Sequence, residues 1–134
     1  MSHIATQRPP IGVRTRRAVT IVVAAAATGL GWAAGRLAHV DYVVQTPMGA
    51  RQITVVLVIA ATAISGLAGW PVFSLVERHA TDVMRAWIAL GLLVLALSIV
   101  PIFVLRASID ARLALTALHC IAAAVLITGL PQRR

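Results

Sequence analysis

Long apolar stretches recur along this chain, separated by short polar segments. Four of them lack acidic and basic side chains in their interiors, and they predict membrane spans over about residues 18–36, 53–76, 86–105 and 113–131. Each is close to the ~20 residues that a helix needs to cross a bilayer. None shows the alternation of apolar and polar residues typical of a membrane β-barrel. The pattern predicts an all-α integral membrane bundle of four transmembrane helices, arranged up-down-up-down.

Composition supports a membrane protein and excludes a soluble globular domain. The chain is 60% hydrophobic and 12% charged, against about 45–50% and about 25% in soluble domains. Its net charge of +8 comes from twelve arginines, four acidic residues and no lysine. Because the arginines fall between the apolar stretches, we expect them to set topology and to bind anionic lipid at the basic N-terminal tail. We expect no binding of nucleic acid.

The arginines are divided unequally between the two sides of the predicted bundle. Eight lie in the two terminal segments and in the loop after the second span, and four lie in the other two loops. The positive-inside rule therefore predicts a multi-pass protein of the bacterial plasma membrane with both termini in the cytoplasm. We expect residues 1–17 to form a flexible basic cytoplasmic tail and residues 18–131 to form the transmembrane domain. The start also resembles a signal peptide, but three more spans follow, so we expect the first span to be retained.

Small residues at four-residue spacing predict where helices approach each other. Gly31 and Gly35 share a face of the first span, and Ala61, Ser65 and Gly69 share a face of the second. Small side chains let membrane helices come close. We expect these two faces to pack together within one bundle, and a homodimer along the same faces is the alternative.

His119 is the ionisable residue that lies inside a predicted span, and such residues are by default functional candidates. It shares a helix face with Arg112 and Thr116. With polar residues of the two outer loops it could line an outward-facing pocket for an anionic or carbonyl-bearing ligand, such as a lipid headgroup or a quinone. The candidate residues are Arg36, His39, Asp41, Arg51, Arg106, Asp110, Arg112, Thr116 and His119. Alternatively, the arginines extend to headgroups and a neutral His119 donates one hydrogen bond to a neighbouring helix.

Several membrane chemistries lack the residues that they need. The chain has a single cysteine, no acidic residue within a span, and one histidine well inside a span. These counts disfavour a thiol oxidoreductase, a carboxylate-driven exchanger and a haem held by two histidines. No nucleophile motif surrounds the serines of the spans. We therefore expect no catalytic residues, no metal site and no cofactor.

Several short segments carry a family resemblance. They are Gly66–Trp70, Leu75–Arg78, Arg85–Trp87, Leu93–Pro101, Ala117–His119 and Leu126–Leu130. Over roughly residues 17–130 the chain resembles a family of small actinobacterial four-span membrane proteins of unknown function. The resemblance implies a four-span architecture, a plasma-membrane location and a pattern that includes Asp41, Glu77, Arg78 and His119. The first loop departs from the glycine-rich loop of that family, and no activity is implied.

Two hypotheses of function follow from these observations. The first is a non-enzymatic accessory or structural subunit that packs with a membrane protein partner or with itself. The second is a small ligand-binding or transport component that uses the outward-facing pocket. If the faces carrying Arg36, Arg112 and His119 converge on one cavity, binding is favoured; if an apolar face is left for a protein contact, the subunit role is favoured.

Overall fold

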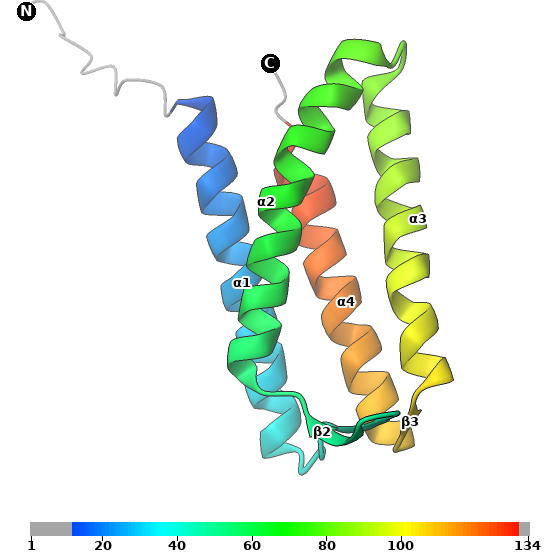
Figure 1. The fold of residues 1–134 in the computed structure, drawn as a ribbon. Helices are drawn as coiled ribbons and strands as arrows, with labels where there is room; N and C mark the ends of the chain where they lie inside the picture. The colour runs from blue at the N-terminus through cyan, green and yellow to red at the C-terminus, as the bar shows by residue number, and fades with distance from the viewer. Residues whose placement is uncertain (1–11, 132–134) are drawn as a thin grey trace, which may run out of the picture.

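Four long helices make up most of the computed structural model, which describes residues 12–131. They are α1 (Val13–Leu37), α2 (Val55–His79), α3 (Val83–Val104) and α4 (Ile109–Gly129). All four are long and apolar enough to cross a membrane, so the predicted all-α membrane bundle is confirmed. Successive helices run in opposite directions, and the start of α1 and the end of α4 lie beside the α2–α3 turn (Figure 1). We call this the terminal end.

The starts of α2, α3 and α4 differ from the expected spans because capping side chains set them, whereas α1 starts earlier than expected without a side-chain cap. α1 begins at Val13, so residues 13–17 of the expected flexible tail are helical, and residues 1–11 of that tail lie outside the described residues. α4 begins four residues before the expected span, where the Ser108 hydroxyl accepts a hydrogen bond from the Ala111 amide at 3.2 Å. The Asp82 carboxylate caps α3 in the same way. Such caps satisfy backbone donors whatever the hydropathy.

A small antiparallel sheet, which hydropathy did not predict, lies across the other end of the bundle, here called the sheet end (Figure 1). Its strands are β1 (Val43–Thr46), β2 (Gly49–Gln52) and β3 (Arg106–Ala107), in the order β2-β1-β3. Gly49, the first residue of β2, follows the turn from β1 at φ 116°, a conformation that glycine adopts without strain. The two loops of this end are thus joined through β1.

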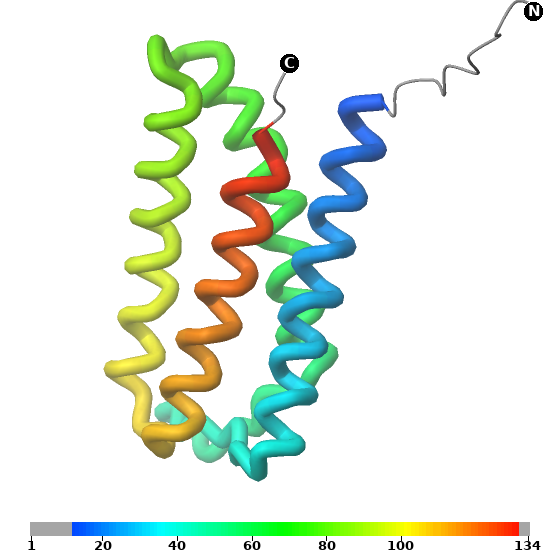
Figure 2. Tube along the Cα trace, turned by 180° about the vertical axis from the view of Figure 1, so that it is seen from behind, coloured from blue at the N-terminus to red at the C-terminus, as the bar shows by residue number. Residues whose placement is uncertain are grey.

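The helices are arranged so that α2 and α3 have little contact. α1 packs against α2 and α4, and α3 packs mainly against α4, which lies between α3 and α1 when seen from behind (Figure 2). At the terminal end, Phe73 of α2 meets Trp87 of α3 edge to face, with ring centres 4.9 Å apart. At the sheet end, Tyr42 and Val44 enter a core formed with α3 and α4. Between these two clusters the α2–α3 side of the bundle stays open.

α1 and α2 do contact each other, but not through the predicted faces. Their contact includes the Thr28 and Thr62 hydroxyls, 3.1 Å apart, and Gly66, where an added Cβ would lie 2.8 Å from Ile21. Ala61 is exposed and lines the open side of the bundle. The contact face of α2 is thus shifted by one residue, about 100° around the helix.

The other small residues of the predicted faces have different neighbours. An added Cβ at Gly31 would meet Leu118 of α4, and one at Gly35 would meet Tyr42 of the loop. An added Cβ at Gly69 would meet Leu130, just beyond α4. Ser65 is exposed beside Ala61. The predicted packing between these residues of the first and second spans is therefore wrong, because the small residues of α1 pack against α4 and the first loop instead.

Candidate functional site

A groove of about 360 Å³ opens between α2 and α3. α2 and α3 form its walls, α4 forms its floor, and the inner face of the sheet closes its end. This volume equals about a dozen water-sized groups at ~30 Å³ each, so it suits one alkyl chain or one small ring system. The groove is lined by Thr28, Val44, Thr46, Arg51, Ile53, Leu57, Val58, Ala61, Thr62, Ser65, Ser98, Pro101, Ile102, Leu105, Ala107, Leu115, Leu118, His119 and Ala122.

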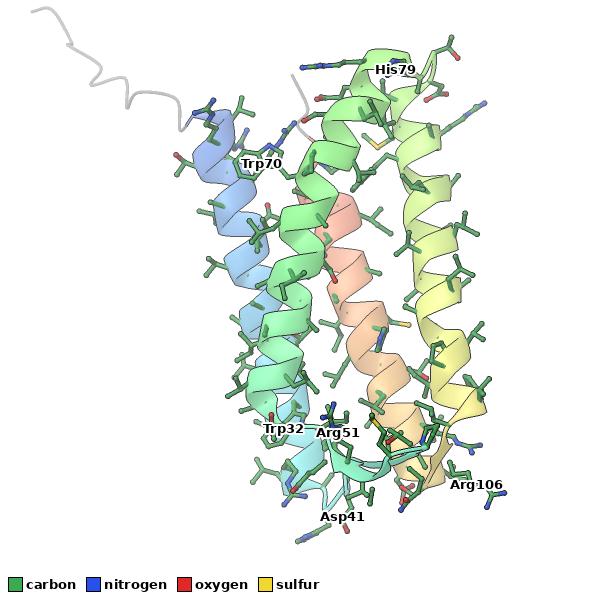
Figure 3. All side chains as sticks on the ribbon, viewed as in Figure 1. Trp32, Asp41, Arg51, Trp70, His79 and Arg106 are labelled. Carbon is green, nitrogen blue, oxygen red and sulfur yellow. The ribbon has the colours of Figure 1, made fainter. Side chains whose placement is uncertain are left out.

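Arg51 brings a positive charge to the sheet end of this groove. It lies opposite Val44 in the β1–β2 register, and directly opposed residues of an antiparallel pair share one face of the sheet. Val44 is buried in the core, so the shared face is the one toward the helices. Figure 3 shows Arg51 on that side of the sheet. No ion pair or hydrogen bond holds its guanidinium among residues 12–131.

His119 lies on the floor of the groove, but it does not bond across the bundle as expected. Its Nδ1 lies 2.7 Å from the carbonyl oxygen of Leu115, one turn earlier in the same helix. The expected hydrogen bond to a neighbouring helix is therefore wrong. A side chain that can reach its own backbone needs no partner on another helix.

The predicted residues of the first loop lie at the rim of the sheet end. Arg36 forms an exposed ion pair with Asp41, at 3.1 Å. His39 has a positive φ of 60° just after α1 and is exposed. Arg106 borders a shallow hollow with Asp41 at the edge of the sheet. None of these four residues lines the groove.

The predicted residues at the start of α4 also stay outside the groove. Asp110 is exposed in the first turn, where the helix dipole favours a carboxylate. Arg112 donates to the carbonyl oxygen of Leu105 at 3.4 Å, and Thr116 donates to that of Arg112 at 2.8 Å. The expected single pocket with four arginines and two acids is therefore wrong. Of its proposed members, Arg51 and His119 are the two that line the groove.

Five hydroxyl side chains of the groove were not among the ligand-binding candidates. Four come from α1, α2 and α3, namely Thr28, Thr62, Ser65 and Ser98, and the fifth, Thr46, comes from β1. For the four helical residues, the sequence offered one indication of a site, which is a hydroxyl side chain inside an otherwise apolar span. Such residues concentrate at helix contacts and polar cavities in membranes. Which span residues face one another depends on helix rotation, which composition alone does not give.

Arg17 is a buried cation at the terminal end, unlike the exposed Arg51, and its contacts are structural. It is 6% exposed, and its guanidinium donates to the Ser74 hydroxyl at 3.2 Å and to the Glu77 carboxylate at 3.3 Å. The guanidinium carbon also lies 5.3 Å from the ring centre of Phe73 and 5.8 Å from that of Trp70. These contacts stabilise the packing of α1 on α2.

Comparison with known proteins gives a family and no function. Residues 9–134 match the model of a family described as a family of unknown function, DUF6069. No curated protein and no solved structure matches the chain. The site therefore has to be interpreted from its own geometry.

Proposed function

We propose that this chain, which belongs to the DUF6069 family, is a non-enzymatic membrane protein that holds one membrane amphiphile in its groove. The observation that carries this proposal is the unpaired Arg51 at the end of an apolar groove that opens between α2 and α3. An amphiphile can enter such a groove sideways from the bilayer. Its chain would replace lipid contacts along the groove, and an anionic headgroup would accept charge-assisted hydrogen bonds from Arg51.

The proposed orientation places the sheet end outside the cell and both termini in the cytoplasm of a bacterium. Among residues 12–131, five arginines lie at the terminal end, namely Arg14, Arg16, Arg17, Arg78 and Arg85. Four lie at or near the sheet end, namely Arg36, Arg51, Arg106 and Arg112. The larger number favours the cytoplasmic side. The resemblance to actinobacterial proteins favours the plasma membrane. The exposed arginines at the start of α1 would then contact anionic lipids of the inner leaflet.

Matched variants of neighbouring residues test the groove itself. Ala61 lines the groove, whereas Ala60, one residue earlier and also exposed, does not. Ala61→Phe should fill the groove and Ala60→Phe should point to lipid. After purification from native membranes in mild detergent, mass spectrometry should detect a stoichiometric amphiphile with wild type and Ala60→Phe, and its loss with Ala61→Phe. Equal retention by both variants would place the amphiphile elsewhere and contradict the proposal.

A second pair of variants tests the charge. Arg51→Gln removes the cation at the groove, and Arg106→Gln removes an exposed cation at the rim. Loss of one charge-assisted hydrogen bond weakens binding by about 1.5–3 kcal/mol, or roughly 10- to 150-fold. We expect this loss for Arg51→Gln alone. A bound species without negative charge, retained by Arg51→Gln, would refute the role of Arg51.

The second candidate function is an accessory subunit, and α3 gives the observation that favours it. Leu92, Leu93, Val94, Leu97 and Val100 are exposed large apolar residues of this helix, which has little contact with α2. A helix of a partner protein or of a second copy could cover this surface. In the same purification, a stoichiometric protein partner or a homodimer that excludes the amphiphile would favour this function.

A further inference from the structure

The hydroxyl groups along the groove have all their protons engaged within the protein. Ser65 and Ser98 each donate to a carbonyl of their own helix at 2.8 Å. Thr46 donates to the carbonyl oxygen across its turn at 2.9 Å. Thr28 and Thr62 lie 3.1 Å from each other and also within reach of carbonyls of their own helices. Whichever threonine donates to the other, both protons are used, so these side chains offer a ligand only oxygen lone pairs.

His119 is also an acceptor toward the groove. A carbonyl oxygen cannot donate, so the 2.7 Å contact with Leu115 fits the tautomer that carries its proton on Nδ1. In this tautomer Nε2 has a lone pair and accepts a hydrogen bond. No hydrogen bond to this nitrogen is made by any residue from 12 to 131.

The groove is therefore divided by hydrogen-bonding character. Arg51 is the one side-chain donor without a partner among the described lining residues, and it lies at the sheet end. His119 lies ten residues beyond the first residue of α4, about 15 Å along the helix at 1.5 Å per residue. The groove thus has a cationic group at its sheet end and hydrogen-bond acceptors farther along, at the level of His119.

From this division we infer that the occupant carries a hydrogen-bond donor, such as a hydroxyl, at the depth of His119, together with its anionic headgroup at Arg51. This inference rests on the proposed function and specifies its ligand class. It also reverses part of the expectation from sequence, because a carbonyl at this depth would face lone pairs and find no donor. Hydroxylated acyl chains therefore suit the groove better than their keto counterparts.

Three fatty acids of equal length test the inference directly. They are stearate, a stearate with a mid-chain hydroxyl, and a stearate with a keto group on the same carbon. The last two differ in mass by two hydrogens, so native mass spectrometry can measure their competition on one sample of the protein in phosphatidylcholine nanodiscs. One membrane hydrogen bond is worth about 0.6 kcal/mol and rarely above ~2. We expect the hydroxy acid to be preferred by about threefold, and by no more than roughly 30-fold.

Variants assign this preference to His119. His119→Phe keeps a ring but removes the acceptor, and it should lower the preference toward equal binding. Thr116→Val changes a polar residue of the same helix that does not line the groove, and it should leave the preference unchanged. Independently of these variants, the imidazole ¹⁵N spectrum of the wild-type protein should show His119 protonated at Nδ1. A ring protonated at Nε2, or equal binding of hydroxy and keto acids to wild type, would overturn the inference.

The same samples separate this inference from the proposed function. If stearate binds to Ala60→Phe but not to Ala61→Phe, the groove holds an anionic amphiphile, whatever the result for the hydroxyl. If none of the three acids binds to wild type and no amphiphile is retained on purification from native membranes, the proposed function itself fails.

Discussion

A single methyl group at Gly66 tests which faces of α1 and α2 are in contact. An ideal Cβ at this position would lie 2.8 Å from Cγ1 of Ile21, 3.1 Å from its Cγ2 and 3.3 Å from Cδ2 of Leu126. Non-bonded carbon atoms prefer about 3.5–4.0 Å. Gly66→Ala therefore requires α1 and α2 to separate or Ile21 to leave its position. Overpacking of this kind costs about 1–3 kcal/mol.

Gly69→Ala is the matched control, because it changes the same helix one turn later. Alanine favours a helix over glycine by about 1 kcal/mol, and this gain cancels in the comparison of the two variants. The added Cβ at Gly69 would lie 3.3 Å from Cδ1 of Leu130, the end of a side chain that can adjust. The difference in unfolding free energy between the variants should thus be about 1–3 kcal/mol, with Gly66→Ala the less stable.

The measurement is thermal unfolding in dodecyl maltoside, followed by tryptophan fluorescence. At roughly 4 °C per kcal/mol for a chain of this length, Gly66→Ala should melt about 4–12 °C below Gly69→Ala. If Gly66→Ala melted no lower than Gly69→Ala, Gly66 would not be packed against Ile21 of α1, and the α1–α2 contact that orients Ala61 toward the groove would be wrong.

Three further predictions concern the ends of the bundle. In a background without the native cysteine, Gln45→Cys should react with an impermeant thiol reagent in intact cells and Thr81→Cys should not; the reverse would invert the topology. Arg17→Leu should lower the free energy of unfolding by about 1–2 kcal/mol, measured by thermal melting, because it breaks a hydrogen-bonded ion pair that is partly exposed at Glu77. Glu77→Gln keeps an acceptor and should lower it less. Equal melting of Arg17→Leu and wild type would show that the pair does not stabilise the fold. Burial raises the pKa of the Tyr42 phenol above 10, although Arg36 opposes the shift, so the folded state keeps a proton that the unfolded chain loses. The free energy of unfolding should therefore fall as pH rises above about 10 in wild type, and it should fall less in Tyr42→Phe. The near-ultraviolet absorbance of this single tyrosine should show its ionisation directly.

The spans could be predicted from sequence because their cause is local. A stretch of about 20 apolar residues satisfies its backbone only as a helix in lipid, and this holds whatever the neighbours are. Contact faces have no such local cause. Thr62 and Ala61 are adjacent in sequence, yet Thr62 is buried against Thr28 of α1, whereas Ala61 is exposed in the groove. The rotation of α2 about its axis depends on contacts with Ile21 of α1 and Leu126 of α4, so the spacing of residues within α2 does not determine it.

Part of the candidate site could be predicted for a similar reason. An imidazole inside a span is conspicuous by composition, and His119 does line the groove. Its partner could not be predicted, because a carbonyl of its own helix competes with every residue of the other helices. Arg51 was a candidate as one loop arginine among several. Its position over the groove comes from the β1–β2 register, in which Val44 anchors the inner face.

The small sheet that the hydropathy pattern missed also explains why the groove exists. α2 follows β2, and α3 leads into β3, while β1 lies between these two strands. Strands are spaced about 4.8 Å apart, and Gln52 and Arg106 pair with β1 residues two positions apart, so the attachment points of α2 and α3 are separated by roughly 12 Å. Packed helices lie only about 8–10 Å apart. At the terminal end the short connection and the Phe73–Trp87 contact draw the same two helices together. β1 therefore keeps α2 and α3 apart at the sheet end, and its pairing with β2 positions Arg51 over the groove. The same strand pairing thus separates the helices and places the charge that we propose binds the headgroup of the amphiphile.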